Sequence, residues 1–552
     1  MNNSGKSRIL RAIAIALSAV QTDKDDLTSG SDAEAIIDVV IAPAPSEGPD
    51  EFDERTSRRL GTWVQRTGQS PVHERAAWRT TIRPSQEGFG ARDTHTQLTW
   101  DVGTQTWQSP PTPTIMAMDQ RSLIASMLIE TRRDVVEEMS QRSSAIRRLL
   151  DDLEIEATRR EELERHLDDL GADIVNASVV LRSMITNLET LNASISSVGS
   201  PRITALPGRL ENLSQAITIE YDTGLGHVPM RLQGAGSRSL TSLQIQNLMY
   251  QRRLGRDGPA LRPHPVTLIE EPEAHLHPQA QFELPGLVNT IIGQKILTTH
   301  SAHIASVVDP RCIRLVRPDG DRIQIRDLKS FLTTEVEAVP EASGTGLGEL
   351  ERLKRSIERP FGELLFATAV VIGDGATERG FFPSIIREAL GQISHGVTVV
   401  DPGGLNTPHA KAILKFAIAL EMPWVIFSDS DEQGQRAVDA LLAIAGSENR
   451  TRVVFVRGRE EGSDVHAIEK MLIEHDSGLC ERACRTLGFD PLSDDLFEFM
   501  RRNKGVTGSL LGLELVATYP CSVGAVPEGW PEPLIELVSS LKSQLQHSET
   551  SN

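Results

Sequence analysis

The alternation of apolar and polar residues changes along the chain and predicts three kinds of element. Short alternating stretches between residues 28 and 113, such as 77–82 and 97–102, are typical of antiparallel strands. From 122 to about 197 the chain is rich in Leu, Glu, Arg and Asp and contains no proline, which predicts a helical hairpin. Beyond 366, apolar runs alternate with helical segments, which indicates βαβ units around a parallel sheet.

The helical hairpin carries a seven-residue apolar repeat. Met139, Ile146, Leu153 and Leu167 share one position of this repeat, and Arg160 interrupts it. Such spacing is typical of a coiled coil used for dimerisation. A helix packed on its own domain has the same spacing, so both interpretations stay open.

Length and charge narrow the class of protein. A chain of 552 residues should form two or three domains. With 57 Lys and Arg against 76 Asp and Glu, the net charge of −19 argues against a protein that coats nucleic acid, although a local basic groove remains compatible. The four cysteines lack zinc-site spacing, and no apolar run approaches the roughly 20 residues that span a bilayer. We therefore expect a cytoplasmic protein with reduced thiols and no membrane partner.

Two apolar runs end in residues with catalytic potential. The run 266–269 leads into Glu270 and Glu271, and the run 295–299 leads into His300. Buried parallel strands often deliver carboxylates to a cleft in this way. One carboxylate can hold Mg²⁺ while the second polarises the water that attacks a γ-phosphate. A core strand followed by a solvated acidic turn would explain a single Glu-Glu pair equally well.

The longer string around these residues resembles a known family. EEPEAHLHP followed by TTHSAH resembles the Walker B, D-loop and switch-histidine segments of ABC-type ATPases. The closest resemblance is to the overcoming-lysogenisation-defect (OLD) family of ATP-dependent nucleases, which includes the Gabija-type nucleases. This resemblance implies that Glu270 binds the nucleotide metal, that Glu271 activates water and that His300 senses the γ-phosphate.

The N-terminal sequence MNNSGKS matches the end of a phosphate-binding loop. Gly5, Lys6 and Ser7 fill the last three positions of G-x-x-x-x-G-K-[ST], in which Lys reaches the phosphates and Ser ligates Mg²⁺. Asn3 and Ser4 complete the NNSGKS form seen in OLD-like ATPases. The first glycine of the motif would lie before Met1, so we expect either a late start of this chain or an altered nucleotide site.

A glycine-rich turn lies between the phosphate-binding loop and the Glu-Glu pair. Gly234, Gly236 and Ser237 precede a helical stretch, and N–H groups at a helix start can bind an anion. The turn departs from the LSGGQ form but occupies the place of the ABC signature loop. The resemblance therefore implies ATP held between two heads of a dimer.

Acidic residues follow two strands of the C-terminal series. Asp374 and Glu378 follow the run 367–372, and Asp429 and Asp431 follow the run 424–427. Residues two apart in an extended chain share a face, so the second pair can face one ion. Together these oxygen ligands predict a site for Mg²⁺ or Mn²⁺.

The order of these acids resembles a Toprim domain, as found in topoisomerases, primases and OLD nucleases. Toprim domains place Glu where this chain has Asp374, and the side chain shorter by one methylene should weaken cleavage. The resemblance also implies that Glu469 is an additional metal ligand and that Lys504 stabilises charge on the scissile phosphate. Each is equally compatible with an ordinary surface charge.

The sequence thus predicts an α/β protein, an ABC-type P-loop ATPase with an inserted helical hairpin followed by a Toprim domain. The expected segments are 1–120 and 201–335 for the ATPase, 121–200 for the dimerisation insertion, 336–365 for a linker and 366–552 for the nuclease domain. The resemblance implies an ATP-regulated, metal-dependent DNA endonuclease in phage defence or DNA repair. It implies a homodimer or higher homo-oligomer, and a helicase-like protein is a further partner compatible with it.

Two other functions remain open from the sequence. A nucleotide-switched DNA-binding or scaffold protein would keep the ATPase but no longer cut. A repair ATPase of the RecF or SMC kind would account for the first 335 residues and leave the C-terminal acids without a role.

Overall fold

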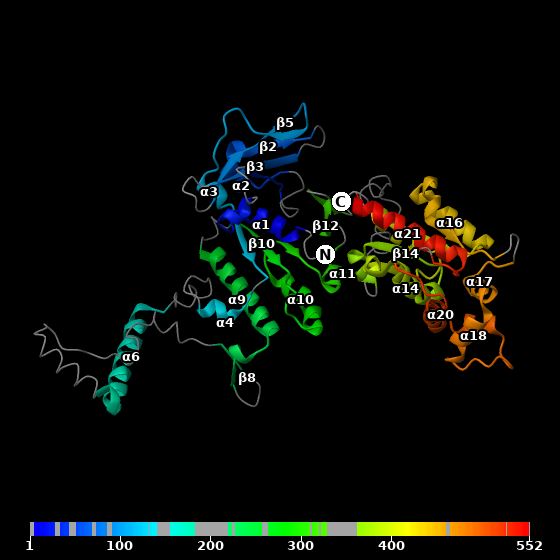
Figure 1. Ribbon diagram of the computed structural model, residues 1–552. Coiled ribbons are helices and arrows are strands. Elements are labelled where there is room, and N and C mark those ends of the chain that lie inside the picture. Colours follow the sequence, from blue (N-terminus) through cyan, green and yellow to red (C-terminus); the bar gives the residue numbers. More distant parts are fainter. Residues whose placement is uncertain are drawn as a thin grey trace, which may run out of the picture. The chain divides into compact units, whose positions relative to one another are not determined.

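The computed structural model describes most of the chain (Figure 1), namely residues 5–27, 34–43, 51–68, 73–84, 91–131, 133–140, 155–182, 219–222, 227–256, 263–309, 312–319, 322–327, 361–459, 464–525 and 527–550. These residues group into two compact units, one of Ser7–Thr299 and one of His300–Asn552 together with Met1–Lys6. Asn3, Ser4 and most of the expected linker lie outside the described residues, as do Ile146 and Leu153 of the apolar repeat.

A three-stranded parallel sheet forms the centre of the Ser7–Thr299 unit. Its order is β11 (Gln294–Thr298), β10 (His264–Glu270), β7 (Ile124–Ile129). Strand β10 is a nearly continuous apolar run because both of its faces are covered. Helix α1 (Lys6–Ala16) packs on it through Leu10 and Ala14, beside Val266 and Leu268. The predicted buried strand that ends in Glu270 is therefore confirmed.

Strand β7 corrects the expected start of the helical insertion. Residues 124–129 were expected to be helical, but they pair in parallel with β10 and contribute the buried Ile129. A six-residue apolar run has no periodicity that separates a strand from a buried helix, and pairing with β10 decides the outcome. The insertion begins after it, with α4 (Val135–Ser140) and α6 (Ala157–Ala177).

An antiparallel sheet adjoins the parallel one, as the alternating stretches predict. It contains β1 (Ala35–Ile41), β2 (Val64–Thr67), β3 (His73–Pro84) and β4 (Ala91–Gln97). Trp63 and Trp78 fill its core. The same unit contains α2 (Glu54–Leu60), β5 (Thr99–Asp101), β6 (Thr106–Gln108), α3 (Met118–Arg121), β8 (Glu220–Asp222), β9 (His227–Pro229), α9 (Ala235–Arg256) and α10 (Pro278–Thr290).

The His300–Asn552 unit contains the βαβ series that the sequence predicts. Its parallel sheet has the order β15 (Val397–Val400), β14 (Ala369–Ile372), β16 (Trp424–Ser428), β17 (Val453–Phe455). The connecting helices are α14 (Ala376–Leu390), α15 (Pro408–Ala419) and α16 (Glu432–Ala445). Because β14 and β16 are parallel neighbours, the residues that follow them lie together at the carboxyl ends of the strands, which we call one edge of the sheet.

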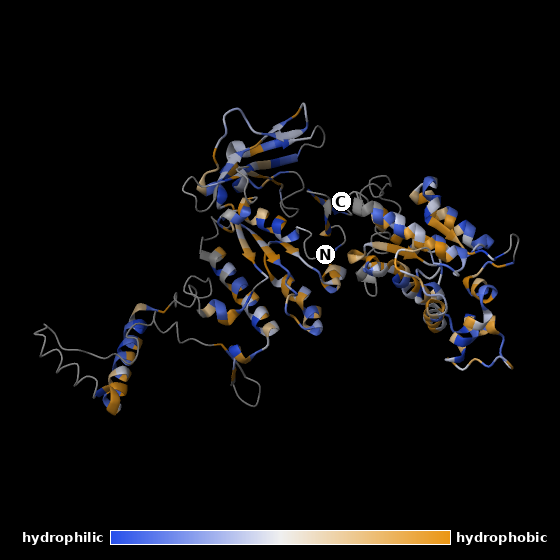
Figure 2. Ribbon diagram, in the orientation of Figure 1, coloured by the Kyte–Doolittle hydropathy of each residue, from blue (hydrophilic) through white to orange (hydrophobic). Residues whose placement is uncertain are grey.

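Two hydrophobic cores cover the two faces of this sheet. Helices α15 and α16 line one core, together with α11 (Ala302–Val307) and partly buried residues beside β12 (Arg314–Asp319), which pairs with β13 (Arg322–Asp327). The other core is lined by α14, α17 (Ile468–His475), α18 (Ser477–Arg485), α19 (Leu496–Arg502), α20 (Lys504–Thr518) and α21 (Glu532–Thr550). In Figure 2 the strands are largely hydrophobic, whereas α16 and α21 carry residues of both kinds.

Helix α21 packs into the second of these cores near the end of the chain. It runs for 19 residues, and Leu534, Leu537 and Leu541 are fully buried in the core. Their spacing of three and four residues forms one apolar stripe, so the C-terminal region is part of the folded unit. No helix in the described ranges is long and apolar enough to cross a membrane.

Helices α14 and α20 meet at a glycine seam formed by Gly380, Gly508 and Gly512. A Cβ atom at Gly508 would lie 2.4 Å from the backbone oxygen of Thr377, and one at Gly512 would lie 2.7 Å from that of Phe381. Only hydrogen fits at these positions, so the two helix backbones touch. The seam brings the start of α20, with Lys504, close to the start of α14.

The glycine seam predicts a large effect from one added methyl group. We expect Gly508→Ala to lower the free energy of unfolding by about 1–3 kcal/mol, because the methyl group collides with backbone that cannot rotate away. Gly505→Ala is the matched control on the same helix, since no atom lies within 4 Å of its added Cβ. Thermal and urea unfolding of both variants would measure this, and equal stability would contradict the seam.

Candidate functional site

Two residues of the Ser7–Thr299 unit that the sequence predicts to bind a nucleotide line one cavity of about 180 Å³. Ser7 at the start of α1 and Glu270 at the end of β10 both line it, as the sequence predicts. Glu130 lines it as well, directly after β7. Sequence analysis missed Glu130 because the apolar run before it was assigned to a helix. The cavity therefore joins a hydroxyl and two carboxylates, which suit Mg²⁺.

Lys6 and His300 meet in the second unit. The Nζ atom of Lys6 lies 3.2 Å from Nδ1 of His300, so the structure brings together two residues predicted to contact phosphate. Gly5 precedes them with a φ of +80°, a left-handed conformation that suits glycine.

The backbone of Glu271 has an unusual conformation. Its φ is +39°. A non-glycine residue in this region is strained, and it keeps this conformation only because its surroundings hold it there. Its N–H donates to the Thr298 carbonyl at 3.0 Å. Its carbonyl accepts from the guanidinium of Arg133, a residue that sequence analysis did not single out.

The glycine-rich turn forms the start of α9, as predicted. Gly234 precedes the helix, and Gly236 and Ser237 lie in its first turn. A Cβ atom at Gly236 would lie 3.1 Å from the His275 carbonyl. The start of α9 therefore packs directly on the turn that follows Glu271.

Four predicted acids lie around one edge of the second unit's sheet. Asp374 follows β14, and Glu378 lies in the first turn of α14. Asp429 follows β16, and Asp431 caps α16 by accepting from the Gly434 N–H at 2.7 Å. Parallel pairing of β14 with β16 is what brings residues some 55 positions apart to one place.

Burial and the charge of neighbouring carboxylates favour the protonated forms of Asp374, Glu378 and Asp429. Burial, the largest cause, and the charges of Asp429, Glu469 and Asp374 together raise the pKa of Glu378 to about 8. Burial also raises the pKa of Asp429 to about 7, with the charge of Asp374 as the next cause. The pKa of Asp374 is raised by burial, although the Leu405 N–H opposes this. Such a cluster favours binding of a cation.

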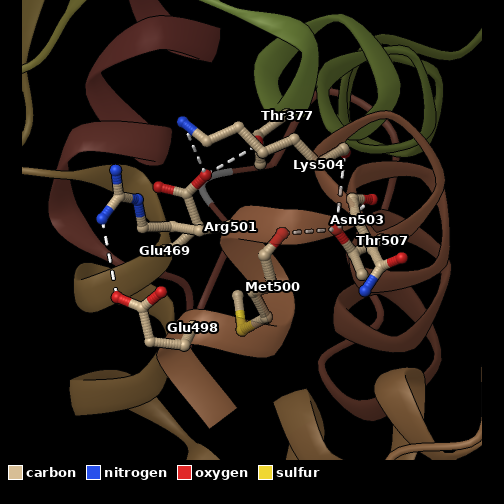
Figure 3. Close-up of polar contacts among 8 residues, drawn as sticks. All are labelled: Thr377, Glu469, Glu498, Met500, Arg501, Asn503, Lys504 and Thr507. Carbon is tan, nitrogen blue, oxygen red and sulfur yellow. Dashed lines mark hydrogen bonds and ion pairs between the residues drawn. The ribbon is translucent and has the colours of Figure 1, made fainter. Parts of the chain in front are cut away.

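Glu469 and Lys504 form an ion pair close enough for both charges to act on Asp429, and Figure 3 shows their contact. The Lys504 Nζ atom lies 3.4 Å from Oε1 of Glu469, and the Thr377 hydroxyl donates to the same oxygen at 2.7 Å. Glu469 is only 2% exposed, whereas the Lys504 side chain is 44% exposed and faces solvent in part. Thr377 was not predicted as a site residue from the sequence, although its position between Asp374 and Glu378 could have indicated a place in the site.

The donor set fits a divalent metal ion, but side chains must turn to bind one. Hard oxygen ligands converge, and Oδ1 of Asp429 is buried without a hydrogen-bond partner among the described residues. Within those residues, no three carboxylate, histidine or cysteine groups are already arranged around one ion position. Asp431 instead caps α16, and Asp374 accepts from the Leu405 N–H at 3.1 Å.

A serine and a histidine support the loop between the two aspartates. The Ser430 hydroxyl lies 2.9 Å from Nδ1 of His466, and the Ser430 N–H donates to the His466 carbonyl at 3.1 Å. This pair ties the segment before α17, which carries Glu469, to the Asp429–Asp431 turn. Sequence analysis assigned His466 no role.

Family comparisons match both units. Residues 1–306 match the family described as AAA domain, putative AbiEii toxin, Type IV TA system. Residues 365–431 match the family described as overcoming lysogenization defect protein-like, TOPRIM domain. The second match ends at Asp431 and includes Asp374, Glu378 and Asp429.

Individual relatives resemble parts of the chain. The uncharacterized protein YbjD of Escherichia coli is 29% identical over 193 residues, which is 33% of this chain and 30% of YbjD. Among solved structures, the C-terminal region of the Xanthomonas campestris pv. campestris OLD protein is 18% identical and covers 34% of this chain and 98% of its own, with a TM-score of 0.25. The C-terminal region of the Burkholderia pseudomallei OLD protein is 16% identical, covers 33% and 99%, and has a TM-score of 0.23.

The raised pKa of Glu378 predicts a pH-dependent stability. The folded state holds a proton that the unfolded state releases above the ordinary pKa of 4.5. Stability from this group is therefore complete at acid pH and is lost as the pH rises through about 8. We expect the metal-free melting temperature to fall over this window and Mn²⁺ to restore it. Glu378→Gln, which mimics the protonated form, should flatten the pH profile, and an unchanged profile would contradict the assignment.

Proposed function

Because the chain belongs to the OLD family, which joins an ATPase domain to a Toprim domain, we propose that it is a metal-dependent DNA endonuclease regulated by ATP. The observation that carries this proposal is the cluster of acids, in which Glu378 and Glu469 are buried and Asp374 and Asp429 half-buried, with Lys504 beside it. A structural ion pair needs no such surplus of negative charge, whereas a site for metal ions and a phosphodiester does.

Each residue of the cluster has a proposed task. Asp374, Glu378, Asp429, Asp431 and Glu469 would hold the ions, which when bound supply Lewis-acid stabilisation and an activated water. Lys504 would turn from Glu469 to the scissile phosphate and stabilise its negative charge. Thr377 orients Glu469 through its hydrogen bond, so that this carboxylate keeps its place when Lys504 leaves.

Nucleotide binding by the ATPase residues would regulate access to the acid cluster. We propose that Ser7 and Glu270, with Glu130, hold the nucleotide metal, that Lys6 and His300 contact phosphate and that Glu271 activates water. Asn3, Ser4 and Gly5, which precede Lys6 in the phosphate-binding loop, would contact ATP as well.

We further propose, from the family resemblance, that the protein acts in the cytoplasm in phage defence or DNA repair. It would act as a homodimer or higher homo-oligomer, with a helicase-like protein as a further partner. Two observations support parts of this proposal. All four cysteines are unpaired, as expected for reduced thiols. Leu170 and Ile174 on α6 are 53% and 39% exposed, as expected for a helix that meets a second copy.

Nicking of supercoiled plasmid tests the nuclease. We expect cleavage with Mg²⁺ or Mn²⁺, its loss in Asp429→Ala/Asp431→Ala, and a decrease of roughly 100-fold in Lys504→Met, because the phosphate loses a fixed positive charge. Arg436→Met, an exposed cation on the neighbouring α16, is the control and should cut normally. Cleavage that survives the double substitution would show that another site cuts.

A non-cutting, nucleotide-switched DNA-binding protein is the second candidate function. It is favoured by Asp374, whose short side chain is already held by the Leu405 N–H. Asp374→Glu separates the two functions, because the longer carboxylate reaches further into the cluster. We expect cleavage to rise about tenfold for a weakened nuclease. Folded protein that binds DNA but cuts under no condition, even with this substitution, would favour the switch.

A further inference from the structure

Arg133 is a buried cation that the proposed chemistry leaves unexplained. It lies between β7 and α4 and is 4% exposed. Its guanidinium donates to the Glu270 carbonyl at 3.0 Å, to the Glu271 carbonyl at 3.1 Å and to the Ser239 hydroxyl at 3.2 Å. Burial lowers the pKa of Arg133, although several neighbouring carboxylates oppose this. A buried charge of this kind is stable only while its acceptors stay in place.

Two of these acceptors are the carbonyls around the strained residue. The carbonyls of Glu270 and Glu271 converge on one guanidinium, whose planar fork fixes two acceptors at once. The Glu271 N–H is held from the other side by Thr298. Rotation of this peptide to an unstrained conformation would leave a buried N–H of Arg133 without an acceptor. The contact therefore offsets the strain at Glu271.

The segment of Arg133 and Asp134 connects the turn at Glu270 and Glu271 to α4 and α9. Asp134 forms an ion pair with Arg238 at 3.1 Å, next to the Ser239 that Arg133 contacts. Further along α4, Glu138 accepts from the Ser242 hydroxyl at 2.5 Å and from the Gln246 amide at 3.0 Å. Helix α4 begins the helical insertion, so its first turns are joined to α9 along one face.

We propose that Arg133 is the positioning residue of the ATPase site, which holds Glu271 in its strained conformation and makes that conformation depend on the placement of α4 against α9. The inference rests on the proposed ATP hydrolysis, but its structural part stands separately. A pull on the helical insertion that moves α4 would draw Arg133 from Ser239 and from the two carbonyls. Glu271 would then lose its orientation, and hydrolysis would slow while ATP stays bound.

Hydrogen exchange tests the structural part without any need for hydrolysis. The amides of Glu271 and Ala274 donate within this turn, to the carbonyls of Thr298 and Glu271. In Arg133→Lys, which keeps the charge but loses the fork, we expect peptides covering 270–276 to exchange roughly tenfold faster. Peptides from β3 should be unchanged. Equal exchange in wild type and variant would overturn the positioning role.

The link to the insertion has its own variant. Asp134→Asn leaves Arg133 in place and removes the ion pair with Arg238. We expect it to accelerate exchange of the same 270–276 peptides, by less than Arg133→Lys does. Unchanged exchange there, with loosened α4, would show that α4 does not act on Glu271.

Steady-state kinetics test the catalytic consequence. We expect Arg133→Lys to lower kcat for ATP about tenfold or more, with the Kd for a fluorescent ATP analogue within about threefold of wild type. Arg58→Lys, an exposed arginine paired with Glu54 on α2, is the matched control. A parallel loss of melting temperature and nucleotide binding would mean a merely structural role. If the wild type hydrolyses no ATP, the proposed function fails, and hydrogen exchange alone decides the inference.

Discussion

The second unit is organised around the repulsion between carboxylates that its own fold buries together. Parallel pairing of β14 with β16 brings Asp374 and Asp429 to one edge, and α14 and α17 add Glu378 and Glu469. Without metal, this charge is offset in part by a proton on Glu378 and by Lys504. The unit thus keeps an unfavourable arrangement that only cations relieve, and the rest of the core must be stable enough to hold it.

The two units place their candidate residues on similar backbone, but the source of strain differs between them. In both, functional residues follow parallel strands at their carboxyl ends, which is where such sheets leave room for ligands. The C-terminal site stores electrostatic repulsion among side chains. The ATPase site stores conformational strain in the backbone of Glu271, and a buried arginine compensates for it. Each site therefore has a cation against it: Lys504 pairs with Glu469 in one, and Arg133 holds the Glu271 carbonyl in the other.

Sequence periodicity was sufficient for the elements whose signal is local. The βαβ series and the acids after its strands follow from alternating apolar and helical runs, and so does the antiparallel sheet. Strand β7 was missed because its short run carries no period of its own, and Glu130 was missed with it. Arg133 was missed because the partners of its guanidinium lie more than 100 residues away in sequence, and no local pattern encodes such contacts. Thr377 has a partner 92 residues away, so only its place between Asp374 and Glu378 could have indicated it. The same holds for the glycine seam, since a glycine gives no sign of which backbone will approach it.

The glycine seam also determines how this protein can vary. Where helix backbones touch, their separation does not depend on the size of any side chain, so the placement of Lys504 relative to α14 is independent of how the rest of the core is filled. Residues such as Leu511 or Leu515 can change in volume, and other core positions can compensate, without altering the reach of that lysine. The arrangement separates the dimensions of the site from the composition of its surroundings. Substitutions can therefore accumulate throughout the core while three glycines stay fixed.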